Sequence, residues 1–566
     1  GERMLPAPWL YLALAVLTLV VLRRAQVRLR LSRAKHPSLR GHSKMSRRVA
    51  RRVPFYEFRE EAAFGRDGAP EAIVARRRAG FERLARLFRE RAPRSLETTE
   101  ALEPAIADLA FINAYRVPFP FRNLVREHLP LGNIATESRG TQIRDADGNW
   151  AYDLSGSYGV NVFGYDFYKQ CLATSFEQAQ PLGPVLGPYH PVITDNVERL
   201  REIAGLEAVS FHMSGTEAVM QAVRLARYHT GRSHLVRFCG SYHGWWDGVQ
   251  PGVGSQRVVD DVYTLKDMDD DTLKVLRTRR DIACVLVSPL QALHPNGGAP
   301  GDATLMAGDR ACAYDRTAYT EWLHQVRAVC TERGIPLIFD EIFSGFRLAR
   351  GGAQEYFGVR ADLVTYGKTL GGGLPVGVLC GSAALMKRYR DHRPTDICFA
   401  RGTFNAHPYV MTAMNAFLRR LEEPGIDALY DDLEGTWDRR AAALNRDLAE
   451  RELPLRIENM VSVWSVLYTR PGRYHWMFQY YLRAEGLQLG WTGTGRLIWS
   501  HDFPEADFEE VRTRFLAAAE AMRGDGWWST PEGLTNKAIK RQVLREMVAA
   551  GLGRRMPDAP RMDSGA

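Results

Sequence analysis

The segment LVTYGKTLGGGLPVG (363–377) carries the clearest structural and chemical signal in this 566-residue chain. Its first five residues form a short apolar run typical of a strand, and Lys368 follows directly, ahead of Gly371, Gly372 and Gly373. A lysine at the end of a buried strand has its pKa lowered by confinement, which suits it to Schiff-base formation. The glycines let a flat cofactor approach the backbone. The alternative interpretation is a surface lysine beside a flexible loop.

A second segment, PLIFDEIFSGFR (336–347), places Asp340 at the end of an apolar strand, 28 residues before Lys368. In a parallel sheet, ligands gather at the carboxyl ends of the strands. A buried carboxylate there needs a cation, and a protonated pyridinium nitrogen would supply one and act as an electron sink. The alternative is that Asp340 caps a helix.

A third segment, HMSGTEAVMQAVRLAR, places Ser214, Gly215 and Thr216 at a turn from a strand into a helix. Backbone amides and the positive end of the helix make such a turn an anion site suited to phosphate. The alternative is an ordinary Ser/Thr helix cap.

In a fourth segment, GSYHGWWDG, Tyr242 and His243 follow another strand. An aromatic side chain at that position would lie flat on a planar cofactor ring, unless it belongs to the core.

Strands and helices alternate between about residues 190 and 380. The runs AVSFHMS, HLVRFCG, ACVLVSP, PLIFDE and VLCGS are short, apolar and bounded by turn residues, and stretches such as DRTAYTEWLHQVRAVCTERG between them are helical in pattern. This alternation predicts an α/β fold with a mostly parallel sheet covered by helices.

The four segments occur in the order phosphate turn, ring stacker, carboxylate and lysine. Together with GTFNAHP (402–408), they resemble the class III, fold-type I aminotransferases that use pyridoxal 5'-phosphate, and most closely the glutamate-1-semialdehyde aminomutases and the aminotransferase domains of polyketide and peptide assembly lines. In that group GGAQEYFGVRADLVTYGKTLGGGLPVG (351–377) is close to a signature, and the resemblance spans about residues 120–525. It implies a mostly parallel seven-stranded sheet with helices on both faces, plus a small α/β domain.

The resemblance also implies roles for single residues. Lys368 would bind the cofactor and then move protons, Asp340 would pair with the pyridine nitrogen, and Tyr242 would stack on the ring. The expected catalytic residues are therefore Lys368, Asp340 and Tyr242. The expected cofactor-binding residues are Ser214, Gly215, Thr216, Tyr242, His243, Gln291, Asp340, Lys368 and Thr403.

Thr403, in the sequence RGTF, matches a threonine that reaches the phosphate in the neighbouring subunit, which implies a homodimer with shared active sites. Gln291 falls near the phenolic oxygen of the cofactor. Tyr158, in SGSYG, matches an aromatic residue at the mouth of the substrate pocket. The partners expected are thus a small-molecule amino donor, a carbonyl acceptor and a second copy of the chain.

The sequence departs from the family at two places. Ser288-Pro289 replaces the usual Glu-Pro. Glu137 falls where the aminomutase has the arginine that binds its substrate carboxylate, and Arg139 lies two positions away as a replacement substrate residue. A carboxylate at Glu137 would repel a carboxylate substrate, so glutamate-1-semialdehyde is not the expected substrate. Together with the N-terminal membrane anchor described below, this leads us to expect an aminotransferase acting on a lipid-like or carrier-bound aldehyde or ketone. The alternatives are an aminomutase, which keeps the amine on one substrate, and a non-catalytic membrane-bound scaffold.

The N-terminal run LPAPWLYLALAVLTLVVL (5–22) has no charge. Eighteen residues at about 1.5 Å each make about 27 Å of helix, enough to cross the hydrocarbon core. Trp9 and Tyr11 suit one interface, and the cations that follow place the catalytic domain in the cytoplasm. The expected location is a single-pass membrane protein. A cleaved signal sequence, which carries its cations before the apolar run, and a soluble helix are the alternatives.

The net charge of +9 resides in residues 23–53, which hold twelve Lys or Arg and no Asp or Glu; beyond residue 53 the chain carries a net charge of −3. No nucleic-acid partner is therefore expected. The basic segment is either attracted to anionic lipid or a solvated linker. The seven dispersed cysteines, with no CxxC pair, suit a reducing compartment and predict no metal site.

These features divide the chain into seven parts. They are a transmembrane anchor (1–22), a basic juxtamembrane segment (23–53), a helical linker region (54–125), the N-terminal part of the small domain (126–185), the large cofactor-binding domain (186–410), the C-terminal part of the small domain (411–530) and a helical tail (531–566).

Overall fold

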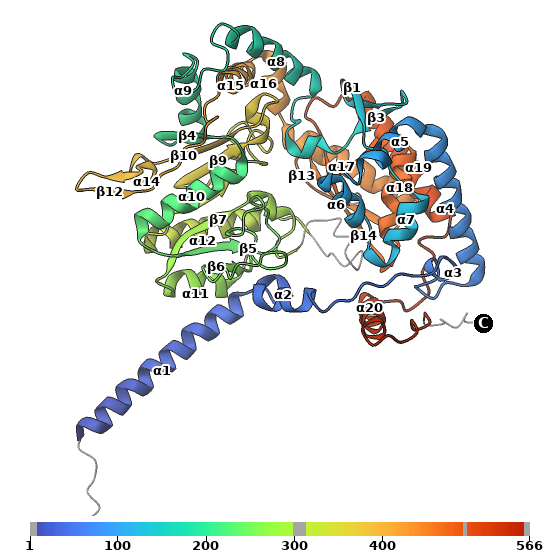
Figure 1. Ribbon diagram of the computed structural model, residues 1–566, viewed down its shortest axis with the longest axis horizontal. Coiled ribbons are helices and arrows are strands. Elements are labelled where there is room, and N and C mark those ends of the chain that lie inside the picture. The colour runs from blue at the N-terminus through green and yellow to red at the C-terminus, as the bar shows by residue number, and fades with distance from the viewer. Residues whose placement is uncertain (1–7, 298–312, 491–494, 560–566) are drawn as a thin grey trace, which may run out of the picture.

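The computed structural model describes residues 8–297, 313–490 and 495–559 (Figure 1). Its centre is a seven-stranded sheet in which β10 alone runs antiparallel to its neighbours, so the mostly parallel sheet is confirmed. The strand order is β4 (Ala208–His212), β10 (Gly377–Gly381), β9 (Leu363–Gly367), β8 (Leu337–Asp340), β7 (Ile282–Val287), β5 (His234–Phe238) and β6 (Val262–Leu265).

Helices cover both faces of this sheet. In β8, Ile338 packs in the hydrophobic cluster of α10 (Gly215–Thr230), whereas Leu337 and Phe339 pack in the cluster that contains α12 (Arg316–Arg333). Successive side chains of a strand point to opposite faces, so a strand that is apolar throughout requires a cover on each side. All four residues of β8 are buried.

The carboxyl ends of the parallel strands gather the predicted site residues. Asp340 is the last residue of β8, Lys368 directly follows β9, and the loop with Tyr242 follows β5. Because β8 and β9 are hydrogen-bonded neighbours, the sheet itself brings Asp340 and Lys368 together.

The small domain joins distant parts of the chain. Two antiparallel strands form a hairpin that turns at Asp147-Gly148, and the short strand β15 adds to it in parallel. This first sheet has the order β1 (Ala135–Arg139), β2 (Gln142–Asp145), β3 (Trp150–Asp153) and β15 (Leu487–Gln488). A second sheet contains β13 (Leu455–Met460), β14 (Val463–Tyr468) and β16 (Arg496–Ile498), with α17 (Leu433–Glu450), α18 (Phe478–Ala484) and α19 (Glu505–Gly524) beside the two sheets.

The N-terminal helix α1 (Pro8–Ala34) projects from the body of the molecule (Figure 1). It is long and apolar enough to cross a membrane: the mean hydropathy of its best 18-residue window is 1.7, and none of that window is buried. The helix does not end at residue 22 as expected, because no Gly or Pro interrupts residues 9–34 and the Arg, Leu and Ala that follow residue 22 favour helix. Its inner end docks on the body, where buried Ala34 accepts a hydrogen bond from the amide of Lys266 at 3.0 Å.

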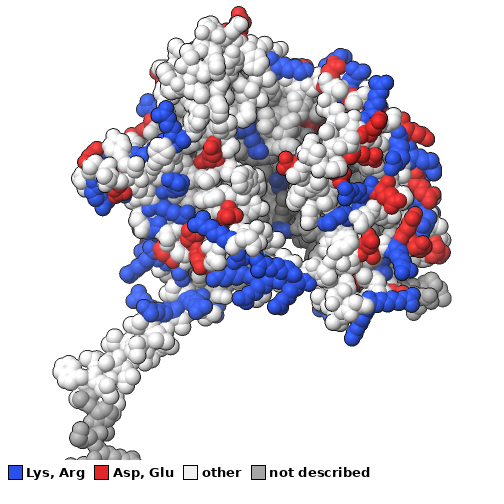
Figure 2. All heavy atoms as spheres, in the orientation of Figure 1, with Lys and Arg blue, Asp and Glu red and all other residues white. Residues whose placement is uncertain are grey.

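The rest of the basic segment also contacts the body. Lys44, in α2 (Ser43–Ala50), pairs with Asp260 at 3.0 Å, and Arg47 donates to the carbonyl of Ser255 at 3.0 Å. Side chains of Lys and Arg gather where α1 meets the body (Figure 2). The segment is therefore structured and partly docked, not a free linker.

The helical linker region and the tail pack on the small domain. Buried Glu546 of α20 (Asn536–Gly551) pairs with Arg66 and Arg473 at 3.1 and 2.5 Å.

The linker contains α3 (Glu60–Ala63), α4 (Glu71–Arg91), α5 (Pro93–Leu102), α6 (Ala107–Tyr115) and α7 (Arg122–His128). The other elements are α8 (Tyr165–Ala179), α9 (Ile193–Ala204), α11 (Asp270–Thr278), α13 (Gly352–Phe357), α14 (Ala383–Met386), β11 (Tyr389–Arg390), β12 (Arg393–Ile397), α15 (Pro408–Arg420), α16 (Pro424–Asp427) and the short 3-10 helices at 39–41, 119–121, 156–159, 289–293, 368–371, 428–430 and 475–477.

The six cysteines within the described ranges are buried and carry free thiols. Cys312 lies outside those ranges.

Candidate active site

Asp340 and His243 form a buried hydrogen-bonded pair at the carboxyl edge of the sheet. His243 Nδ1 lies 2.8 Å from Asp340 Oδ2, and its Nε2 lies 3.0 Å from Ser241 Oγ. Burial lowers the pKa of His243, although the hydrogen bond and the charge of Asp340 raise it. The ring is therefore neutral at pH 7, and it donates from Nδ1 because a carboxylate only accepts.

The other carboxylate oxygen of Asp340 accepts hydrogen bonds from residues on β9 and just after β8. Oδ1 accepts from the amide of Ile342 at 3.1 Å and from Thr365 Oγ1 at 3.3 Å. The carboxylate is thus fixed from two sides at the end of its strand, which suits a group that must face a cation without moving.

Lys368 lies beside this carboxylate in a strained backbone conformation. Its φ is 47°, in the left-handed region that favours glycine, and such outliers cluster at functional sites. A Cβ on Gly159 would lie 3.3 Å from Lys368 Cδ, so the loop with Tyr158 passes directly over the lysine. Burial lowers the pKa of Lys368; the charge of Asp340 raises it and that of Arg347 lowers it.

Arg347 belongs to the site but was not among the residues predicted from the sequence. It is fully buried and donates to the carbonyls of Asn161 and Trp499, at 3.0 and 2.6 Å, and to Ser462 Oγ at 3.0 Å. No carboxylate of the described residues forms an ion pair with it. Burial lowers its pKa to about 10. The only sequence signal was its place in the same segment as Asp340.

The predicted phosphate turn has the shape of an anion site. Ser214 caps α10 by accepting from the amide of Glu217 at 3.3 Å, and no acceptor within the described residues faces the amides of Gly215 and Thr216. A Cβ on Gly244, whose φ is 102°, would lie 2.5 Å from Thr216 Oγ1. Only glycine fits there, so the loop after β5 closes over the first turn of the helix and leaves its amides for a ligand.

Tyr242 presents its ring to open space beside the carboxylate. Its side chain is 67% exposed, yet the charge of Asp340 contributes, after burial, to raising the pKa of its hydroxyl. An anion-binding turn, an exposed aromatic ring, a fixed carboxylate and an amine of lowered pKa are the four groups that pyridoxal 5'-phosphate requires. The residues present therefore fit this cofactor.

Gln291 lies next to the cluster, whereas Thr403 lies in a separate exposed turn. Gln291 Nε2 donates to the carbonyls of Cys239 and His294, so it holds the start of the loop that carries Tyr242. Thr403 is exposed in a turn before α15, and its side chain makes no hydrogen bond with the described residues of its own chain.

Tyr158 and Arg139 lie in different places. Tyr158 is 56% exposed with a φ of 58°, next to Gly159 and so near the lysine. Arg139 lies on β1, where it pairs with Glu137 at 3.0 Å and covers Trp150. The structure brings together Lys368, Asp340, His243, Tyr242 and the phosphate turn, with Tyr158 alongside. It does not bring Arg139 into this group.

The comparisons with known proteins agree with this geometry. The family model for class III aminotransferases matches residues 125–251 and 315–494, more than half of the chain. The chain belongs to the class III aminotransferase family. It is a transaminase that depends on pyridoxal 5'-phosphate, as the family and the site together require.

Two curated relatives are glutamate-1-semialdehyde 2,1-aminomutases. The enzyme of Methanocaldococcus jannaschii is 31% identical over 362 residues, covering 61% of this chain and 78% of its own. That of Acetivibrio thermocellus is 35% identical over 310 residues, covering 51% and 66%.

Solved structures share the fold. An omega-transaminase from Sphaerobacter thermophilus is 26% identical, with a TM-score of 0.58, and the match covers 70% of this chain and 92% of that one. A glutamate-1-semialdehyde-aminomutase from Pseudomonas aeruginosa PAO1 has a TM-score of 0.63 at 18% identity, covering 80% and 99%.

Proposed function

We propose that this chain is a membrane-anchored aminotransferase that moves an amino group from a small-molecule donor to a lipid-like or carrier-bound aldehyde or ketone. The observation that carries its catalytic part is the grouping of Lys368, Asp340 and His243 at one edge of the sheet, with an amine of lowered pKa beside a fixed carboxylate. A non-catalytic scaffold has no need for such an amine.

Each residue of the candidate site has a role in this amino transfer. The cofactor, when bound, supplies a carbonyl that takes up amines and a ring that spreads the charge of a carbanion. The turn at Gly215 and Thr216 would bind its phosphate, and Asp340, oriented by His243, would supply the negative charge that pairs with the ring nitrogen. Lys368 Nζ then removes a proton from the substrate carbon and returns it in the reverse half of the reaction. Its lowered pKa favours the neutral amine that this step requires.

The docking of α1 supports a retained anchor over a cleaved signal sequence. The apolar half of the helix is exposed, whereas its last residues bind the body at Ala34 and Lys266. Cleavage after the apolar run of a signal sequence would separate that run from Ala34 and Lys35, which pair with the edge of the sheet at Leu265 and Lys266. The cations at the inner end of α1 suit the cytoplasmic side of a membrane (Figure 2).

An apolar surface next to the site supports the proposal of a second copy of the chain. A pocket of 240 Å³ next to the phosphate turn is lined mainly by apolar groups, among them Met213, Val376 and Phe404. Trp245, which lies three residues after Tyr242 in the same loop, is 78% exposed. We propose that a homodimer covers this surface and that Thr403 reaches the partner's cofactor.

The substrate assignment rests on two features. Glu137, where the aminomutase has its carboxylate-binding arginine, is paired with Arg139 and Arg144 on an exposed strand. The anchor keeps the site near a membrane, where long-chain or carrier-bound carbonyl compounds are at hand.

A donor–acceptor screen of the purified full chain by mass spectrometry tests the proposal. We expect amino transfer from a separate donor to a long-chain aldehyde or ketone. Conversion of glutamate-1-semialdehyde without any donor would instead assign the aminomutase activity. The absence of turnover with every pair, together with no cofactor absorbance, would favour the scaffold.

A further inference from the structure

The tail helix α20 has an apolar stripe on the side that faces away from the body. Its inner side is buried and contains Ile539, Gln542, Val543 and Glu546. Leu544, Val548 and Leu552 lie on the other side, and each is more than half exposed. Residues four apart lie above one another on a helix, so these three side chains form one continuous stripe.

Cations flank this stripe. Between residues 536 and 555 the sequence has six Lys or Arg and one acidic residue, Glu546. Glu546 is fully buried and paired with Arg66 and Arg473, so it adds no negative charge to the exposed side. The exposed side, named here the outer face of α20, consists of Lys537, Lys540, Arg541, Leu544, Arg545, Val548 and Leu552. It is therefore apolar along its middle and positive along its sides.

The outer face belongs to the same edge of the body as the N-terminal helix. In the view of Figure 1, α2 and α20 both lie along the lower edge of the body, where α1 leaves it. A Cβ on Gly551 would lie 3.9 Å from Pro54 Cγ, so the end of α20 adjoins the chain four residues after α2 ends. Phe55, beside that contact, is also more than half exposed. A membrane that holds α1 is therefore within reach of α20.

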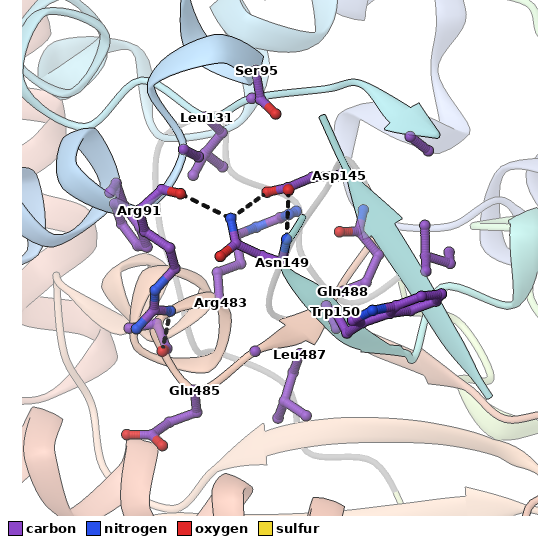
Figure 3. Close-up of a pocket in the computed structure, with 18 of the residues that line it drawn as sticks. Arg91, Ser95, Leu131, Asp145, Asn149, Trp150, Arg483, Glu485, Leu487 and Gln488 are labelled. Atoms are coloured by element: carbon purple, nitrogen blue, oxygen red, sulfur yellow. Dashed lines mark hydrogen bonds between the residues drawn. The ribbon is translucent and has the colours of Figure 1, made fainter. Parts of the chain in front are cut away.

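The cavity of 750 Å³ between α4, α5 and the first sheet of the small domain differs, because its polar groups already bind one another. Asn149 Nδ2 donates to the carbonyl of Arg91 at 2.9 Å and to Asp145 Oδ2 at 2.8 Å, and Arg91 donates to the carbonyl of Ala484 at 2.6 Å (Figure 3). None of the predicted site residues lines this cavity. Its wall points to no ligand, whereas the outer face of α20 presents charge and apolar surface together.

We propose that the outer face of α20 lies on an anionic lipid bilayer, as a second membrane contact beside α1. The proposal rests on the membrane-anchored function proposed above. Helices that carry Leu and Val between Lys and Arg lie in the plane of the interface, where the apolar side chains enter the acyl boundary and the cations bind anionic headgroups. Two contacts fix the rotation of the body about α1 and hold the active site at a set height above the bilayer.

The charge of the outer face disfavours a second copy of the chain as its occupant. A two-fold contact places the same surface on itself, so cations would face cations. Three apolar side chains bind a bilayer only weakly, since even a single myristoyl chain binds marginally. α1 keeps α20 close to the bilayer and so raises its effective concentration there. A chain without α1 therefore stays in solution.

The test places a fluorophore on α20 of the full chain in lipid vesicles. The native cysteines of the described residues are buried, so in a Cys312→Ser background Val548→Cys is the thiol that takes up an environment-sensitive maleimide. The vesicles contain phosphatidylcholine with or without phosphatidylserine, and a part of the lipid carries bromine on its acyl chains, which quenches a fluorophore in contact with it. In the anionic vesicles we expect a blue shift and quenching for Val548→Cys, and neither for Glu198→Cys, on α9 far from α20 (Figure 1).

Removal of two cations tests the role of charge. Arg541→Gln with Arg545→Gln should lower the ratio of inserted to exposed label about 30-fold, since each cation near an anionic surface contributes roughly 1 kcal/mol. Arg201→Gln with Arg446→Gln, which removes two exposed cations of α9 and α17, is the matched control and should leave the ratio unchanged. A ratio that the first pair does not change, or equal quenching in neutral vesicles, would overturn the assignment to anionic lipid.

Extraction of the vesicles with alkaline carbonate separates this inference from the proposed function. A chain that resists extraction while its Val548→Cys label stays in water has the anchor without the second contact, which overturns the inference alone. If carbonate removes the chain, the anchor proposal fails, and the label is read again on the full chain held by an N-terminal hexahistidine tag and nickel-chelating lipid. Quenching there supports the contact of α20, and its absence overturns it. A label shielded from iodide without vesicles would instead assign the face to a second copy of the chain.

Discussion

His243 donates a hydrogen bond from Nδ1 to Oδ2 of Asp340 across 2.8 Å, and both side chains are buried at the carboxyl edge of the central sheet. The buried His243 side chain therefore orients the carboxylate of Asp340. That arrangement is useful only if the carboxylate must keep its charge and its direction, as a partner for a ring nitrogen must.

His243→Phe should weaken cofactor binding about 10-fold. The change keeps a ring in the space but removes the donor, and a hydrogen bond to a charged group is worth roughly 1.5–3 kcal/mol. Fluorescence titration of the apo chain with pyridoxal 5'-phosphate measures the change. His229→Phe, which removes a half-buried ring that contacts a carbonyl away from the site, is the control. Equal affinities in the parent and His243→Phe would mean that the pair does not orient the carboxylate.

Arg347→Met should move the pH dependence of the reaction upward. The charge of Arg347 lowers the pKa of Lys368, so its removal raises that pKa, and the neutral amine then forms only at higher pH. The acidic limb of the kcat profile should shift to higher pH in Arg347→Met and stay near the parent's in Arg347→Lys, which keeps a positive charge. An unshifted limb in a folded Arg347→Met would show that this charge does not act on the lysine.

Lys368 should also make the stability of the apo chain depend on pH. Its pKa is lowered in the folded chain, so the unfolded chain binds more protons between that pKa and about 10.4. The free energy of unfolding of the apo chain should therefore rise with pH through that window. Lys368→Met should flatten this rise relative to the parent in denaturant titrations at several pH values; an unchanged slope would contradict the lowered pKa.

Removal of the anchor should depend on where the chain is cut. A chain that begins at Arg23 keeps the contact between Ala34 and Lys266, whereas one that begins at Pro54 exposes the edge of β6. We expect the first to be soluble without detergent, with the melting temperature of the full chain, and the second to melt lower. A chain starting at Arg23 that still sediments with membranes would contradict α1 as the main anchor.

Glu546→Gln should destabilise the chain by about 3–5 kcal/mol, because it leaves Arg66 and Arg473 as buried cations without their carboxylate. Urea unfolding of the full chain measures this, with the exposed Glu532→Gln as control. A loss below about 1 kcal/mol would mean that the tail does not hold the linker region to the small domain.

Much of the sheet and the centre of the site could be predicted from the sequence, because their signals are local. The apolar runs PLIFD and LVTYGK each lead directly into a residue that carries chemistry, and parallel strands present those ends together. The strand β6 was not predicted: Val262–Leu265 follows two aspartates at the edge of the sheet, and its pattern is short.

The roles of the arginines could not be predicted, since they depend on distant contacts. Arg347 binds Ser462, 115 residues away, and no local pattern reveals that. Arg139 was misplaced for a different reason: a bulge between Ala135 and Glu137 shifts the register of β1, so alignment by sequence does not tell which face its side chains occupy.

Visible absorbance shows whether Lys368 binds pyridoxal 5'-phosphate, as the proposed function requires. The full chain, purified with pyridoxal 5'-phosphate, should be yellow, retain the colour through gel filtration and lose it when an amino donor is added. Lys368→Ala should not form the lysine-bound absorbance band and should lose turnover. A colourless parent chain, or a Lys368→Ala variant with the parent's absorbance and activity, would contradict the account.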